Sequence, residues 1–181
     1  VIHYSLDSGG SGGISEPAFQ RDVERFSKWL ETQPGTIHVD RFTNVMKRLN
    51  KNMHGDDNSY YRLPDNRELA AQYLLLYEMS LPYGLDLNNQ INVDKSSAKL
   101  TVTIDVLSSQ EMIDFNLRAL AWAAENAPSF ANTDSAGITL MFSHIGQRNI
   151  YAMIIGTTTA LILISGLLIV ALRSVKLGLI S

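Results

Sequence analysis

The chain has 181 residues, with 15 Lys and Arg against 18 Asp and Glu, so its net charge is −3. This slight acidic excess gives no basis for nucleic-acid binding. The chain contains no Cys, which excludes disulfide bonds and zinc–thiolate sites and suits a bacterial envelope protein that is stable without cross-links.

The first predicted element is a strand at residues 1–7. Ile2, Tyr4 and Leu6 alternate there with polar side chains, which is the pattern of a half-buried strand. A glycine-rich loop follows at residues 8–13. It lacks both a following Lys-Ser/Thr pair and the GxGxxG spacing, so it does not predict a nucleotide site.

Two amphipathic helices and a short strand are expected between residues 15 and 52. Ser15 is the expected N-cap of the first helix, which ends at Pro34-Gly35. The apolar face of this helix is formed by Phe19, Val23, Phe26 and Leu30. Residues 37–39 predict a strand, and residues 42–52 predict a basic helix. Its cations are typical of a solvated face, with binding of acidic lipid headgroups as the alternative; they are Lys47, Arg48 and Lys51.

The polar stretch at residues 51–65 contains His54, Asp56 and Asp57, three residue types that can ligate a metal ion. They lie in one turn-rich loop without regular spacing, which is weak support for a metal site. We therefore expect neither a metal nor a cofactor.

The helix predicted at residues 67–81 is the most hydrophobic element of the soluble part. Its apolar side chains fall on more than one face, which favours burial on two sides. The alternative is that some of them line a greasy substrate path or contact a neighbouring subdomain, because aromatic and Met side chains adapt to different chains. The candidates for this path are Tyr73, Leu74, Tyr77 and Met79.

A strand, a helix and a strand are expected between residues 99 and 142. Residues 99–106 alternate clearly, and Ser108 is expected to cap the helix. The core side of this helix is predicted to carry Met112 or Ile113, Leu117, Leu120 and Ala124. The last strand is predicted from the alternation of Ile138, Leu140 and Phe142.

The predicted order is strand, helix, strand, a helical insertion, strand, helix, strand. This is the split βαβ order of an α+β, ferredoxin-like fold. The side chains expected to be buried together in this domain are Phe19, Phe26, Leu100, Val102, Leu117 and Ile138.

Residues 150–172 contain no charged residue. As a helix with a rise of ~1.5 Å per residue they would span ~35 Å, more than the ~30 Å hydrocarbon core of a bilayer, so we expect a transmembrane helix. Residues 1–149 carry 13 Lys and Arg and 18 Asp and Glu, hence −5, whereas Arg173 and Lys176 give the tail +2. By the positive-inside rule this tail is cytoplasmic, and residues 1–149 lie on the periplasmic side.

Small residues repeat every four positions on one face of this helix, at Ala152, Gly156 and Ala160, and such a face allows close packing of helices in lipid. After Lys176 the chain is apolar again. We interpret this as the start of a further, truncated membrane segment; a single anchor with a frayed apolar end is the alternative.

The chain begins without Met or a signal-peptide pattern, so we expect an internal piece of a longer, multi-pass membrane protein. Its expected parts are a soluble domain at 1–146, a transmembrane helix at 147–175 and the start of another membrane segment at 176–181.

Three stretches are distinctive: Asn92-Val93-Asp94-Lys95 before the strand at 100–104, the helix sequence GTTTALILISGLLIVALRS from Gly156, and the link Lys176-Leu177-Gly178-Leu179-Ile180-Ser181. Together with a periplasmic α+β unit that leads into a membrane helix, they resemble the resistance-nodulation-division (RND) superfamily. The likeness is greatest to its MMPL-like branch of predicted exporters.

The resemblance implies a proton-driven exporter of lipids or other amphiphiles in the bacterial inner membrane, whose porter-type domain forms part of the substrate path. The implied partners are the rest of the same polytopic protein, the bilayer and a hydrophobic or amphiphilic substrate, and a homo-oligomer is compatible with it. The family's proton relay uses acidic residues of a later membrane helix. This chain has no Asp or Glu after Asp134, so no relay residue is assigned.

The competing hypothesis is an extracytoplasmic sensor or interaction domain on a membrane anchor. The apolar restart after Lys176 and the small-residue face favour the transporter. An enzyme is not expected, because no Ser lies in a GxSxG turn and the four His residues show no nucleophile or metal spacing; they are His3, His38, His54 and His144.

Overall fold

The computed structural model describes residues 1–80 and 89–172 and has a mixed α+β architecture. Its elements in chain order are β1 (Ile2–Asp7), η1 (Gly13–Ser15), α1 (Pro17–Glu31), β2 (Thr36–Asp40), α2 (Thr43–Met53), η2 (Asn58–Tyr60), α3 (Arg67–Ser80), β3 (Ser97–Ile104), α4 (Ser109–Asn126), β4 (Asn132–Ala136) and α5 (Ile138–Leu172). The predicted tail with Arg173 and Lys176, and the apolar restart at 176–181, lie outside the described residues.

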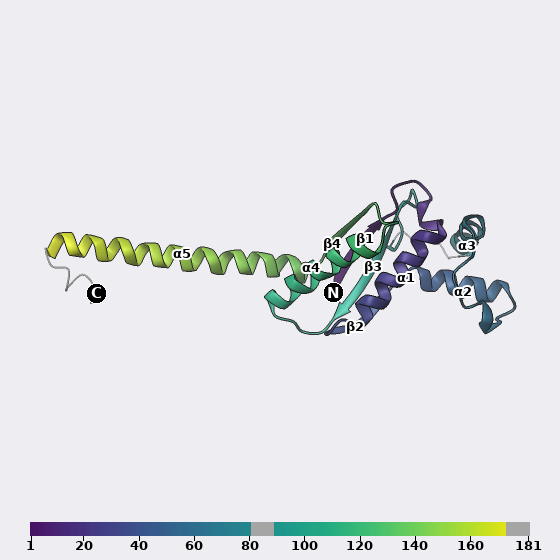
Figure 1. Cartoon of the computed structure of the whole chain (residues 1–181), viewed down its shortest axis with the longest axis horizontal. Helices are drawn as coiled ribbons and strands as arrows, with labels where there is room; N and C mark the ends of the chain where they lie inside the picture. Colours follow the sequence, from purple (N-terminus) through teal and green to yellow (C-terminus); the bar gives the residue numbers. More distant parts are fainter. Residues whose placement is uncertain (81–88, 173–181) are drawn as a thin grey trace.

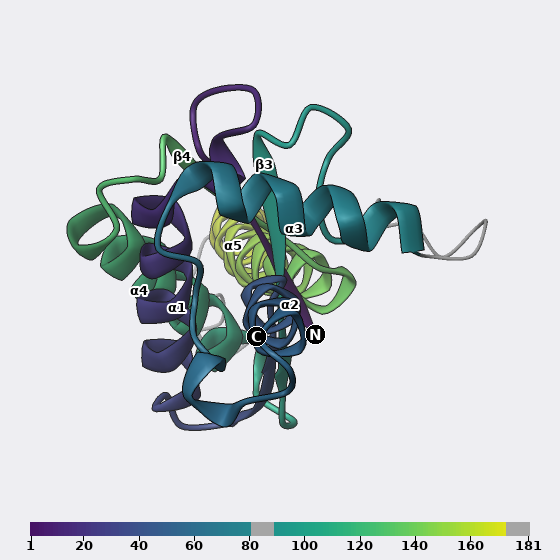
Figure 2. The ribbon, with the colours of Figure 1, turned by 90° about the vertical axis from the view of Figure 1, so that its right-hand side faces the viewer.

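The strands form one sheet in the order β2-β3-β1-β4, with every neighbouring pair antiparallel. Tyr4 of β1 lies opposite Leu100 of β3 and opposite Ser135 of β4. Helices α1 and α4 lie side by side on one face of this sheet (Figure 2). The core lies between these two helices and the sheet, because a helix or a sheet with one apolar face must bury that face against another element.

The core contains the predicted side chains of β1, α1 and β3 and several that were not predicted. Phe19, Phe26, Leu100 and Val102 are all buried, so these four predictions are confirmed. The apolar faces of these elements are well separated from their polar faces, which is why the periodicity identified them.

Helix α1 begins at Pro17, and its N-cap is Glu16 rather than the predicted Ser15. Pro fixes a helical φ and has no N–H to leave unpaired, so it is favoured at the first helical position. Ser15 instead ends the short helix η1 and is buried there. Gly35 has a φ of +84°, a left-handed conformation that glycine adopts without strain, and it turns the chain into β2.

Helix α4 has the predicted cap, and its buried face agrees with the predicted one at Met112 and Ile113 but not farther along the helix. The Ser108 hydroxyl and the Glu111 carboxylate form a complete capping box. The buried side chains are Met112, Ile113, Phe115, Asn116, Ala119 and Ala123. Leu117, predicted to be in the core, is 58% exposed and Ala124 is exposed, so these two predictions are wrong, whereas Leu120 packs partly against the core.

The predicted last strand at 138–142 is wrong, because these residues form the first turns of α5. The fourth strand is β4, five mostly polar residues that pair with β1 alone. Ile138, predicted to be buried, is 74% exposed, whereas Leu140 is buried.

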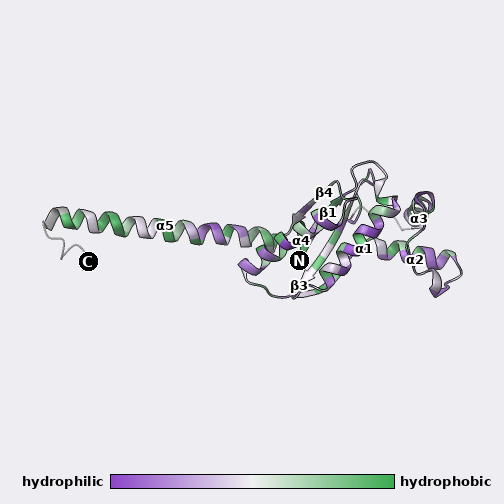
Figure 3. Ribbon diagram, viewed as in Figure 1, coloured by the Kyte–Doolittle hydropathy of each residue, from purple (hydrophilic) through white to green (hydrophobic). Residues whose placement is uncertain are grey.

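Helix α5 runs without a break from the domain to residue 172, so the predicted continuous helix at 150–172 is confirmed. Its first turns contact α4 and β1, with Leu140 and Ser143 buried there. No residue from 148 to 164 is buried, and this part of α5 projects away from the domain (Figure 1). It belongs to the most apolar stretch of the chain (Figure 3). Among the described residues it is the one helix that is long and apolar enough, by length and composition, to cross a membrane.

Candidate functional site

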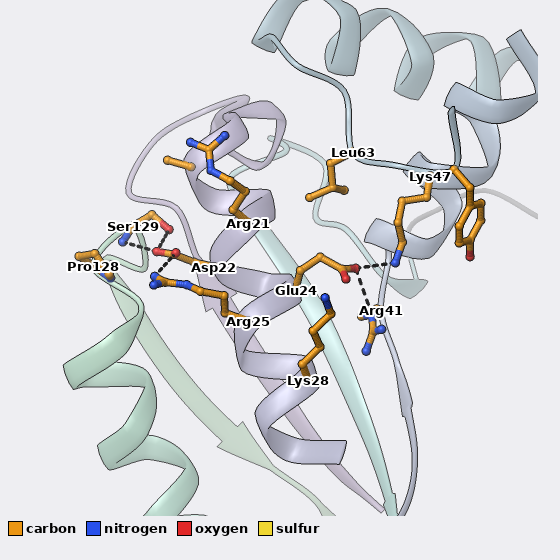
Figure 4. A pocket seen from close by; sticks show the side chains of 12 residues that line it. Arg21, Asp22, Glu24, Arg25, Lys28, Arg41, Lys47, Leu63, Pro128 and Ser129 are labelled. Atoms are coloured by element: carbon orange, nitrogen blue, oxygen red, sulfur yellow. Dashed lines mark hydrogen bonds and ion pairs between the residues drawn. The ribbon is translucent and has the colours of Figure 1, made fainter. Parts of the chain in front are cut away.

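An open groove of about 960 Å³ runs along the outer face of α1 (Figure 4). It is bordered by α1, by the segment from the end of β2 into α2, by the chain after η2 and by the loop between α4 and β4. We call it the α1 groove, and its lining residues are Ala18, Arg21, Asp22, Glu24, Arg25, Lys28, Arg41, Lys47, Tyr61, Leu63, Pro128 and Ser129.

Cations dominate the lining of the α1 groove. Arg21, Arg25 and Lys28 are spaced by four and three residues, so they share one exposed face of α1. Arg41 and Lys47 lie on the other side of the groove (Figure 4). Five lining residues are therefore cationic and two are acidic, a local balance of 5 − 2 = +3 in a chain whose net charge is −3.

Glu24 is held by three groups that reach it from α2 and the segment before it. Its Oε1 accepts a hydrogen bond from the Thr43 hydroxyl at 2.6 Å and lies 2.9 Å from Lys47 Nζ and 3.2 Å from Arg41 Nε. Burial by itself would raise the pKa of Glu24, but the hydrogen bonds from Thr43 and Lys47 and the nearby charges outweigh it and lower this pKa. Glu24 is therefore ionised at neutral pH and interacts with Thr43, Lys47 and Arg41.

Asp22 is the second acid of the groove, and it is buried. It accepts hydrogen bonds from the Ser129 backbone N–H at 3.0 Å and from the Ser129 hydroxyl at 2.6 Å, and it pairs with Arg25. These bonds tie the loop after α4 to α1. Among the described residues, no carboxylate lies within 4.0 Å of the charged groups of Arg21 or Lys28, so the groove retains cations that its own acids do not neutralise.

The lowered pKa of Glu24 makes stability depend on pH. In the unfolded chain Glu24 titrates near its usual value of 4.5, so its stabilising contribution is present above that pH and is lost as the pH falls through the lower folded pKa. We expect the free energy of unfolding to fall more steeply between about pH 5 and pH 3 in the parent chain than in Glu24→Gln. Urea unfolding at several pH values measures this slope. Glu125→Gln on the exposed side of α4 is the control, and equal slopes for the parent and Glu24→Gln would contradict the expectation.

The structure divides the four predicted path residues of α3 into two pairs. Tyr73 and Leu74 are buried, and the Tyr73 hydroxyl donates a hydrogen bond to Asn50 Oδ1 of α2 at 3.1 Å. Tyr77 is half-buried, and Met79 is 76% exposed. Burial of the first pair agrees with packing inside the domain, whereas a role for Tyr77 and Met79 in a path stays a prediction.

The other predicted sites are also located. Ala152, Gly156 and Ala160 are all exposed on α5, and their role in helix packing stays a prediction. Among the described residues, no three His, Asp or Glu side chains are grouped as metal ligands. His54 instead stacks on Tyr60, with ring centroids 3.8 Å apart.

The basic helix α2 lies at the end of the domain away from the projecting part of α5 (Figure 1). In this arrangement α2, which carries Lys47, Arg48 and Lys51, lies away from a bilayer that α5 would cross. The solvated-face interpretation fits Arg48, which is exposed, but not Lys47, which is 13% exposed and pairs with Glu24.

The α1 groove was not predicted from the sequence. The available signal was the spacing of Arg21, Arg25 and Lys28, which places three cations on the face of α1 opposite its buried residues. No protein-family model matches this chain, and no curated protein matches it.

Proposed function

We propose that this chain is part of a proton-driven exporter of lipids or other amphiphiles in the bacterial inner membrane, of the RND superfamily and its MMPL-like branch. In this proposal residues 1–149 lie on the periplasmic side, and the soluble domain forms part of the substrate path. The observation that carries it is the continuity of α5, which is anchored in the domain by Leu140 and Ser143 and extends into an exposed, uncharged stretch. A domain that is joined to a candidate span by an unbroken helix would move together with that span.

The ferredoxin-like assignment of the domain is part of this proposal. The strand order β2-β3-β1-β4 with antiparallel neighbours supports it, as do α1 between β1 and β2 and α4 between β3 and β4. Helices α2 and α3 fall between β2 and β3, where a helical insertion was expected.

The proposed substrate path includes α3. Tyr73 and Leu74 fix this helix to the core, so the side chains that remain for a path are Tyr77 and Met79, together with Leu75 and Leu76, which are exposed on the same helix. An apolar surface of this kind in a soluble domain is typical of an interaction site for apolar groups.

Photocrosslinking in the intact membrane protein tests this path. A photoreactive amino acid is placed singly at Leu76, at Met79 or at Leu117, an equally apolar and exposed control position on α4. We expect lipid adducts at the two α3 positions and none at Leu117. Equal adducts at all three positions, or none on α3, would contradict the proposal. Absence of adducts on α3 is also what the competing hypothesis, a sensor or interaction domain on an anchor, predicts.

A further inference from the structure

We propose that the α1 groove binds the phosphate or sulfate headgroup of an anionic amphiphile. The amphiphilic nature of the ligand rests on the proposed function, whereas its negative charge follows from the groove itself. No residue of this groove belongs to the candidate path on α3.

The first argument is the surplus of positive charge. Asp22 is paired with Arg25, and Glu24 is shared by Arg41 and Lys47. Arg21 directly precedes Asp22, and Lys28 lies one turn after Glu24; both stand on the same face of α1 without an acid partner among the described residues. Exposed like charges three or four positions apart on a helix repel one another, and Arg21, Arg25 and Lys28 have this spacing. An anion bound in the groove would reduce this repulsion.

The second argument is the state of Arg41, whose side chain is only 9% exposed. Its guanidinium pairs with Glu31 through Nη1 at 2.6 Å and with Glu24 through Nε at 3.2 Å. These two ion pairs fix the guanidinium in the lining of the groove, so an entering anion would meet a cation that is already positioned. Arg is also the side chain that best matches the geometry of phosphate-like groups.

The third argument is the size and composition of the groove. At about 960 Å³ it exceeds the needs of an inorganic anion. Apolar groups from Ala18, Tyr61, Leu63 and Pro128 lie in the same lining as the cations. Lys47 lies over the Tyr61 ring at 5.5 Å from its centroid, so charge and apolar surface are in direct contact there. This combination fits a headgroup with an attached apolar chain better than it fits a small ion or a highly charged polymer.

The test measures binding to the full chain in nanodiscs of zwitterionic lipid, by calorimetric titration with octyl phosphate. The groove variant is Arg21→Gln with Lys28→Gln, two exposed side chains without described acid partners. The matched control is Lys99→Gln with Arg118→Gln, which removes the same charge from exposed positions of β3 and α4. We expect the groove variant to bind octyl phosphate roughly tenfold more weakly than the parent, as two lost exposed charge contacts imply, and the control to bind it like the parent.

Three further probes identify the occupant. Octyl glucoside has the apolar chain without the charge, inorganic phosphate has the charge without the chain, and a short poly-glutamate peptide represents an acidic polypeptide. We expect each of them to bind the parent more weakly than octyl phosphate does. Equal weakening in the groove variant and its control would overturn the site. Phosphate or the peptide binding as tightly as octyl phosphate would overturn the amphiphile as its occupant.

This titration does not depend on transport. Loss of lipid adducts at Leu76 and Met79 with intact octyl phosphate binding would defeat the proposed function but not the anion site. Lipid adducts on α3 without octyl phosphate binding would defeat only the groove inference. Unfolding of both Gln variants in urea is compared with that of the parent, and Lys28→Gln alone replaces the double variant if the latter is destabilised.

Discussion

Replacing Phe26 by Ala is expected to lower the free energy of unfolding of the soluble domain by about 4 kcal/mol. Phe26 is fully buried. Its ring meets Tyr4 edge-on at 5.5 Å between centroids and stacks on Trp122 at 5.6 Å. The substitution therefore removes a large apolar side chain from the contact between β1, α1 and α4, and the rigid rings around it cannot close the cavity.

Urea unfolding of the full chain in detergent micelles, followed by Trp fluorescence, measures this loss. Both Trp residues, Trp29 and Trp122, stack on Phe26, so their emission reports the cluster directly. The control is Leu117→Ala, which truncates an exposed side chain of α4 and should cost less than about 0.5 kcal/mol. If Leu117→Ala were as destabilising as Phe26→Ala, the buried face of α4 described above would be incorrect.

This pair of substitutions also illustrates where the sequence predicts the core and where it does not. Phe26 lies in a helix whose apolar residues occupy one face, so periodicity alone was sufficient. Helix α4 carries apolar residues on several faces, and the predicted core side included Leu117 but neither Phe115 nor Ala119, which are buried. Ala119 and Ala123 are buried there, because small side chains let a helix pack closely on its neighbours, a requirement that residue hydrophobicity does not reveal.

Strand β4 was missed for a different reason. It is an edge strand of polar residues and forms its hydrogen bonds through the backbone to β1. Such a strand needs no alternating apolar pattern, because neither composition nor burial selects for one at an edge. Ile138, Leu140 and Phe142 do alternate with other residues, but they belong to the first turns of helix α5. Of these three side chains, Leu140 alone is buried in the core.

The α1 groove was missed because it is assembled from segments that are far apart in the sequence. Asp22 and Ser129 are 107 positions apart, and Glu24 and Thr43 are 19 apart. Their hydrogen bonds follow from the packing of α1 against α2 and against the loop after α4, and no local motif encodes them. The single local sequence signal of the α1 groove is the row of cations on α1, and such rows usually form a solvated helix face.

The second large effect is expected from a charge in the exposed stretch of α5. Ile162→Glu should disfavour membrane insertion by about 3 kcal/mol, because an ionisable side chain at the centre of a span must be transferred into hydrocarbon. Ile162 is 67% exposed and lies in the part of α5 that makes no contact with the domain core. Insertion is measured with a glycosylation-mapping reporter that carries the full chain.

Ile138→Glu is the matched control for this substitution. Ile138 has a similar exposure and lies in the same helix, but at its first residue, beside the domain and twelve positions before residue 150. A charge there stays in water if the span begins near residue 150, so Ile138→Glu should insert like the parent. Equal insertion of all three chains would mean that the apolar surface of α5 is covered by protein rather than by lipid, and the transporter proposal would then lose the observation on which it rests.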